Sequence, residues 1–165
     1  MTEPPPRKAA PDTLGHATLA GLDALREALT PRDRPLVVNH WATWCEGCVV
    51  ELPLLVELHD RCCGQVDFLG ISWDRFMASG SPLQTLQRID ATCDRLGVGW
   101  RTLVYTGAPA DLFGGLALGT ETIPQTALIL PGGRVAWSRE VPLEPEDLAD
   151  LEARIRTFTA TKAEG

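Results

Sequence analysis

Short apolar blocks along the chain predict a series of buried strands. Each block has three to eight residues, is rich in branched residues, and is bounded by polar or turn-forming residues. The blocks are 36–38, 66–73, 100–105, 125–130 and 134–138. The last two flank Gly132-Gly133, a pair typical of a tight turn between adjacent strands.

Apolar residues at helical spacing predict helices between these strands. The helical segments are 19–29, 45–62, 82–96, a short one at 111–117, and a last one that begins near Pro145. Strands and helices therefore alternate until the final hairpin. This order predicts an α/β fold in which helices cover both faces of a central sheet.

The composition indicates one globular domain. The 165 residues are 44% hydrophobic and 22% charged, which are ordinary values for a folded domain. We expect a flexible segment at 1–12 with four prolines, a single domain at 13–161, and a monomer. The net charge of −7 argues against nucleic-acid and membrane-surface binding, and no apolar run is long enough to span a bilayer.

The segment Trp41-Ala-Thr-Trp-Cys45-Glu-Gly-Cys48 carries the candidate chemistry. It follows a predicted strand directly and opens a predicted helix, where free amide groups and the helix dipole favour an anion. The thiolate of Cys45 should therefore be stabilised, and the thiolate is the attacking species in disulfide exchange. Cys48 lies one turn further along, where it can attack a mixed disulfide formed on Cys45. The alternative is half of a zinc site, which Cys62, Cys63 or a histidine would have to complete.

Two further motifs accompany the cysteines. Val37-Val38-Asn39-His40-Trp41-Ala42-Thr43-Trp44 precedes them, and Glu51 and Pro53 follow them; downstream stands Thr122-Ile123-Pro124-Gln125-Thr126. Together these resemble the thioredoxin superfamily, and more closely its TlpA/ResA-type thiol-disulfide oxidoreductases. The similarity runs from about residue 36 to residue 158. It implies a thioredoxin-like fold with a central mixed sheet, helices on both faces and an inserted βα unit.

The resemblance also implies roles for individual residues. Cys45 would be the exposed nucleophile and Cys48 the resolving thiol. Pro124 would follow a cis peptide bond opposite them, and the backbone of Ile123 would pair with an extended substrate. Glu51 would accept a proton; its alternative is a solvated carboxylate that favours the helix dipole. Trp44 would border the site.

The implied reaction needs no cofactor and no metal. Its partners would be protein disulfides or dithiols and an unidentified electron donor. Two other activities are possible on this fold: thiol peroxidase chemistry, whose usual cysteine spacing is missing here, and copper or zinc delivery.

Three features depart from the family pattern. Asn39 replaces a buried Asp and so removes a possible internal base, and His40 replaces a Phe, either as a packed histidine or as a group that tunes the thiolate. Glu46-Gly47 stands between the cysteines without the usual proline. Because the Glu46 anion opposes a thiolate on Cys45, we expect a reducing couple, roughly −220 to −280 mV.

The other three cysteines have no assigned chemistry. Cys62 and Cys63 are adjacent at a helix end, and Cys93 lies on an apolar helix face, where a thiol acts as a small hydrophobic group. Three spare thiols, and an N-terminus without secretory features, favour the cytoplasm. The alternative is a periplasmic or other extracytoplasmic protein from which a targeting segment was removed.

Overall fold

The computed structural model describes residues 12–31, 33–77, 79–113 and 121–164. Side chains are not described for residues 163 and 164. Its strands are β1 (Thr13–Leu14), β2 (Ala17–Ala20), β3 (Leu36–Trp41), β4 (Asp67–Ser72), β5 (Thr102–Tyr105), β6 (Gln125–Ile129) and β7 (Val135–Arg139). Its helices are α1 (Leu22–Ala28), α2 (Glu46–Arg61), the 3-10 turn η1 (Asp74–Met77), α3 (Pro82–Leu96), α4 (Pro109–Phe113) and α5 (Pro145–Glu164).

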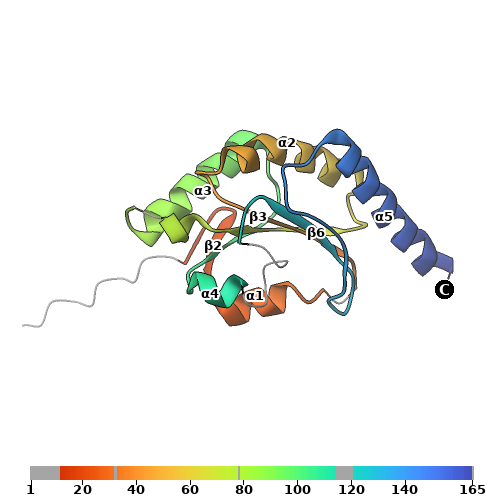
Figure 1. Cartoon of the computed structure of the whole chain (residues 1–165), viewed down its shortest axis with the longest axis horizontal. Coiled ribbons are helices and arrows are strands. Elements are labelled where there is room, and N and C mark those ends of the chain that lie inside the picture. The colour runs from red at the N-terminus through yellow and green to blue at the C-terminus, as the bar shows by residue number, and fades with distance from the viewer. Residues whose placement is uncertain (1–11, 32, 78, 114–120, 165) are drawn as a thin grey trace, which may run out of the picture.

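The strands form one mixed sheet in the order β1-β2-β5-β4-β3-β6-β7 (Figure 1). Strand β3 lies inside the sheet: it pairs in parallel with β4 and antiparallel with β6, which sets Asn39 beside Thr126. Strand β5, which follows α3 in the chain, lies between β2 and β4; the inserted βα unit that the resemblance implies stays a prediction. The predicted α/β architecture is confirmed.

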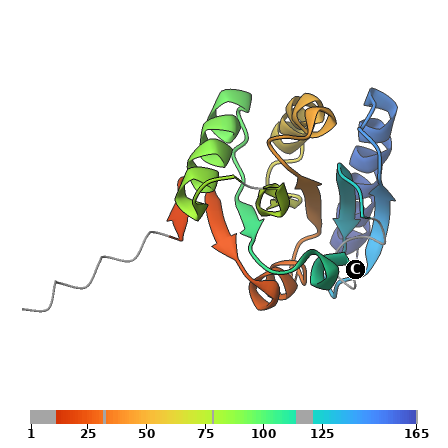
Figure 2. The same ribbon diagram turned by 60° about the vertical axis from the view of Figure 1, so that its left-hand side comes forward.

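Helices cover both faces of the sheet. Helices α2, α3 and α5 lie over one face, and α1 and α4 lie over the other (Figures 1 and 2). The first layer packs through Leu52, Leu55, Leu86, Ile89, Leu151 and Ile155, all fully buried. The second packs through Leu25 and Leu112. Within the described residues, no helix combines the length and the apolar character needed to cross a bilayer.

The helix predicted at 19–29 is wrong at its start. Residues 17–20 form strand β2, which pairs in parallel with β5, and the helix begins only at Leu22 after the N-cap Gly21. The apolar spacing from Leu19 onward is real, but the backbone of β2 gains strand partners about 85 residues away, and such pairing overrides local periodicity. The edge strand β1 was not predicted at all.

The remaining differences lie at ends of elements. Helix α4 begins at Pro109, two residues before the predicted start, and residues 114–117 of the predicted helix lie outside the described residues. So does the predicted flexible segment, apart from Asp12. Helices α2 and α3 and the hairpin β6–β7 agree with the prediction to within one residue at nearly every end.

Candidate functional site: a disulfide at the start of a helix

Cys45 and Cys48 form a disulfide at the N-terminus of α2. Their Cα atoms lie 5.3 Å apart. Cys45 is the N-cap residue, with extended backbone angles, and it is half-buried, whereas Cys48 is fully buried one turn into the helix. The structure therefore makes only the first sulfur accessible to another protein.

The Cys45 sulfur occupies the place where a Ser or Asp oxygen usually caps a helix. It accepts the backbone N–H of Cys48 at 3.3 Å. A negative charge at this position is favoured by that N–H and by the aligned peptide dipoles of α2. Once the disulfide is reduced, the same surroundings stabilise a Cys45 thiolate.

The Ile123–Pro124 segment lies against this disulfide. The peptide bond between the two residues is cis. The carbonyl oxygen of Ile123 is 4.0 Å from Cys45 Sγ. A Cβ atom on Gly47 would lie 3.1 Å from Pro142 Cγ, so a glycine here allows the Pro142 ring to approach the cysteine loop; Pro124 Cδ, at 3.9 Å, would be at ordinary contact distance.

Glu51 is buried, with only 1% of its surface exposed, so it is not a solvated carboxylate. Its Oε1 accepts hydrogen bonds from Asn39 Nδ2 at 2.8 Å and from the Thr126 hydroxyl at 3.3 Å. Its Oε2 accepts the backbone N–H of Leu143 at 2.8 Å. Removal from water outweighs these bonds and raises the pKa of Glu51 from 4.5 to about 7.

Glu51 also lies one turn after Cys48 on the same helix. Positions three apart share a helix face, so the carboxyl group belongs to the buried side on which Cys48 lies. A carboxyl group with a pKa of about 7 both gives and accepts protons at neutral pH.

Asn39 supports this carboxyl group. Besides its bond to Glu51, Asn39 Nδ2 lies 3.0 Å from Thr126 Oγ1 and 3.3 Å from the Gln125 carbonyl oxygen. The sequence indicates that Asn39 removes an internal base from β3; the structure shows that a carboxyl group nonetheless lies there, supplied by α2. Thr126 and Leu143 are not among the predicted site residues, because their contacts with Glu51 join segments that are far apart in the sequence.

Asp74 fixes the loop that precedes the cysteines, a role that no sequence pattern indicates. Its side chain is fully buried. Both carboxylate oxygens accept the Thr43 N–H at 3.2 Å, the Thr43 hydroxyl donates to Oδ1, and the Ser72 hydroxyl donates to Oδ2 at 2.6 Å. Arg88 Nε, 3.8 Å from Oδ1, supplies a positive charge. The backbone two residues before Cys45 is thus held to η1.

His40 lies on the opposite face of β3 and is a packed histidine. It is buried, and its Nδ1 accepts the indole N–H of Trp73 at 2.9 Å. Burial lowers the pKa of His40 from 6.5 to about 4, so the ring is neutral at physiological pH. Successive strand residues point to opposite faces, which separates His40 from the face of Asn39 and Glu51.

The remaining predicted residues border the disulfide or lie away from it. Trp44 is 46% exposed, and Glu46 is exposed in the first turn of α2. Cys62, Cys63 and Cys93 are free thiols. Cys62 caps the far end of α2, about 25 Å along the helix axis from Cys45, so it cannot complete a zinc site there. Within the described chain, no third His, Cys, Asp or Glu joins the Cys45–Cys48 pair in a cluster that could hold a metal ion.

Comparison with known proteins gives matches among solved structures only. No protein-family model matches the chain, and no curated protein does. A thioredoxin-related protein from Neisseria meningitidis serogroup B has 22% identity and a TM-score of 0.60, over 77% of this chain and 88% of that one. A thiol:disulfide interchange protein of the thioredoxin family from Chlorobium tepidum has 20% identity and a TM-score of 0.58, over 81% of this chain and 83% of that one. A DsbF homologue from Corynebacterium diphtheriae has 20% identity and a TM-score of 0.58, over 74% of this chain and 73% of that one.

At 20–22% identity and TM-scores of 0.58–0.60, these likenesses concern the fold. The chain has the thioredoxin fold.

Proposed function

We propose that this protein is a thiol-disulfide oxidoreductase that exchanges its Cys45–Cys48 pair with protein disulfides or dithiols. The observation that carries the proposal is the unequal exposure of the two sulfurs: Cys45 is accessible at a helix N-cap, and Cys48 is buried behind it. The name of the matched structure from Chlorobium tepidum, a thiol:disulfide interchange protein, supports the same activity.

The reaction starts from the reduced protein. The Cys45 thiolate attacks one sulfur of a substrate disulfide; a mixed disulfide forms, and the other substrate sulfur leaves as a thiolate and takes up a proton. Cys48 then loses its proton, with Glu51 as the acceptor we propose, and attacks Cys45 Sγ. The mixed disulfide breaks, the second substrate thiol is released, and the Cys45–Cys48 disulfide forms. Two electrons have passed to the substrate, and an electron donor must restore the dithiol.

Exposed apolar side chains around the site favour a protein substrate. Four of the five exposed large hydrophobic residues in the described chain come from segments that adjoin the disulfide: Trp44, Val50, Met77 and Val141. Trp44 and Met77 also line a groove of about 410 Å³ together with Thr43 and Arg88. Apolar surface of this kind marks contact sites for other proteins.

Two cysteine variants test the exchange reaction. Cys45→Ser should abolish the reduction of insulin disulfides, and Cys48→Ser should stop at the mixed disulfide and so accumulate a covalent complex on a non-reducing gel. Cys63→Ser, which removes an exposed thiol outside the site, is the matched control and should retain full activity. Normal insulin reduction by Cys45→Ser would refute the proposal. Trapping with Cys48→Ser in the native cell would identify the substrates.

We further propose that the couple is reducing. Glu46 places a negative charge in the same helix turn as the Cys45 sulfur, which disfavours the thiolate and hence the reduced form. Equilibration with glutathione should give a potential of roughly −220 to −280 mV, and a value above about −180 mV would contradict this. Glu46→Gln should raise the potential, whereas Glu57→Gln, exposed later in the same helix, should not. The three free thiols support a reducing compartment such as the cytoplasm.

A further inference from the structure

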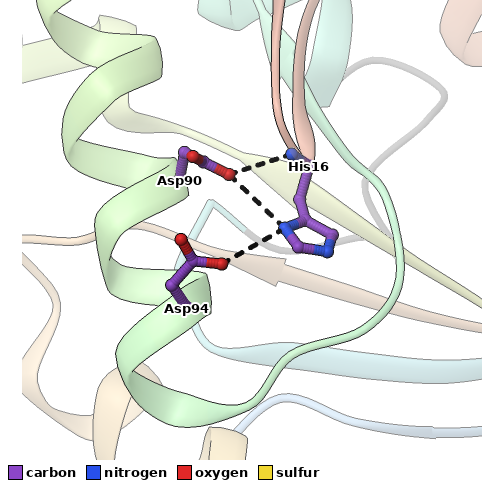
Figure 3. Close-up of side chains that lie close together, drawn as sticks. All are labelled: His16, Asp90 and Asp94. Carbon is purple, nitrogen blue, oxygen red and sulfur yellow. Dashed lines mark hydrogen bonds and ion pairs between the residues drawn. The ribbon is translucent and has the colours of Figure 1, made fainter.

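One imidazole and two carboxylates converge at the edge of the sheet, where the β1–β2 turn meets α3 (Figure 3). His16 Nδ1 lies 3.4 Å from Asp90 Oδ1 and 3.8 Å from Asp94 Oδ1. The three ligand atoms all lie within 4.8 Å of one another. None of these residues takes part in the chemistry proposed for the dithiol.

The local sequence builds this cluster from two elements. Asp90 and Asp94 are four apart on α3, so both point to the same side of the helix. The His16 backbone N–H donates to Asp90 Oδ1 at 3.0 Å and holds that carboxylate in place. Gly15 has φ +55°, and a Cβ atom there would lie 2.1 Å from Asp90 Oδ1. A glycine at this position is what allows the turn to approach the carboxylate so closely.

We propose that His16, Asp90 and Asp94 bind a divalent transition-metal ion, with Zn²⁺ as the reference ion. A mixed set of one imidazole nitrogen and two carboxylate oxygens suits zinc and its neighbours better than Mg²⁺ or Ca²⁺, which prefer oxygen alone. Two ligands at about 2.0–2.1 Å from a tetrahedral ion lie about 3.3–3.4 Å from each other. The separations of 3.4 and 3.8 Å are close to this spacing.

Charge and exposure favour the same occupant. Two carboxylates four residues apart on a helix repel each other, and a dication between them removes that repulsion. The Asp94 side chain is 68% exposed, so it can turn toward an ion, and water has access to a fourth coordination position. Asp90 and His16 are half-buried, and the His16 backbone N–H holds the Asp90 carboxylate, which fixes that ligand beforehand.

A metal at this position would fasten the β1–β2 hairpin to α3. Strand β1 has two residues and, among the described residues, one strand partner, so it contributes little pairing there. An ion shared between the hairpin turn and the helix stabilises the folded chain according to its concentration, because the unfolded chain does not hold the three ligands together. The ion would therefore stabilise the fold, with water at its fourth coordination position.

The test uses the oxidised full chain carrying Cys63→Ser, so that neither the dithiol nor the exposed thiol binds zinc. Titration calorimetry with zinc chloride should show one ion per chain, and zinc should raise the melting temperature. Asp94→Asn and His16→Gln should each weaken binding at least about tenfold. His59→Gln is the matched control: His59 Nδ1 also lies near a carboxylate, 3.6 Å from Asp60, but outside any three-ligand cluster in the described chain, so binding should be unchanged.

Two results would overturn the proposal. One is an absence of binding up to about 1 mM zinc, which would leave an ion pair between His16 and the two carboxylates and nothing more. The other is unchanged affinity in Asp94→Asn. A second measurement does not depend on how the variants fold: Mn²⁺ added to the same oxidised chain should broaden the amide resonances of residues 15–17 and 90–94 before all others, and broadening elsewhere would refute the site.

Discussion

Replacing Glu51 by Gln should make the protein more stable at high pH than the wild type. The carboxyl group keeps its proton in the folded chain up to a pKa of about 7, against 4.5 when unfolded. Between these values the unfolded chain has released the proton and the folded chain has not, so rising pH favours unfolding. At about 1.4 kcal/mol per pH unit, the loss approaches 3 kcal/mol by pH 7.

Glutamine has the same shape as glutamate and carries no charge, so the variant does not lose this stability as the pH rises. Its amide nitrogen needs an acceptor where Asn39 now donates. A flipped Asn39 amide supplies one through Oδ1, which has no hydrogen-bond partner among the described residues. The substitution should therefore be tolerated in the core.

Urea denaturation of both oxidised proteins, at pH 5, 6, 7 and 8, measures the effect. The free energy of unfolding of Glu51→Gln minus that of the wild type should grow by about 2–3 kcal/mol from pH 5 to pH 8. The difference between the two proteins is compared, and not the wild-type value alone, because His40 changes the wild-type free energy of unfolding with pH in the opposite direction. Glu57→Gln, exposed on the same helix, should show no such trend. A difference that stays constant within about 0.5 kcal/mol would refute the burial argument for Glu51.

Two further predictions concern buried groups near the site. Asp74→Asn turns an amide nitrogen toward groups that donate to the carboxylate, among them the Thr43 N–H, so it should cost about 1–3 kcal/mol in urea denaturation and slow insulin reduction. The exposed control Asp67→Asn should do neither, and equal effects of both would count against a special role for Asp74. His40, with a pKa of about 4, should give ring resonances that stay constant from pH 5.5 to 8, and a titration inside that range would contradict its buried, neutral state. Stability conferred by this neutral ring is lost as pH falls from 6.5 toward 4, where the unfolded chain binds the proton first.

The sequence was informative wherever the signal is local. The cysteine spacing, the strand before it and the proline after Ile123 identify the two sulfurs and the segment that faces them. Helix α3 could be predicted end to end because Ser81 caps it, Pro82 begins it and Gly97 ends it. Each of these signals lies within one element.

What could not be predicted depends on contacts between distant segments. Glu51 is buried by partners from β3, from β6 and from the loop before α5, and its spacing alone left a solvated group equally possible. Asp74 follows a strand like many polar residues, and only the fold brings the Thr43 amide to it. Strand β2 forms because β5 is available as a partner, which no pattern within residues 17–20 indicates.

Pro53 removes one backbone hydrogen bond from the interior of helix α2. A proline has no N–H, so the Val49 carbonyl receives no hydrogen bond from position 53, although Val49 itself still donates to the Cys45 carbonyl. The turn that carries both sulfurs is therefore joined to the rest of the helix by one backbone hydrogen bond fewer. Reduction must move the sulfurs from bonding distance to contact distance. That movement can be taken up within the turn that precedes Pro53, because this turn makes one backbone hydrogen bond fewer to the rest of the helix.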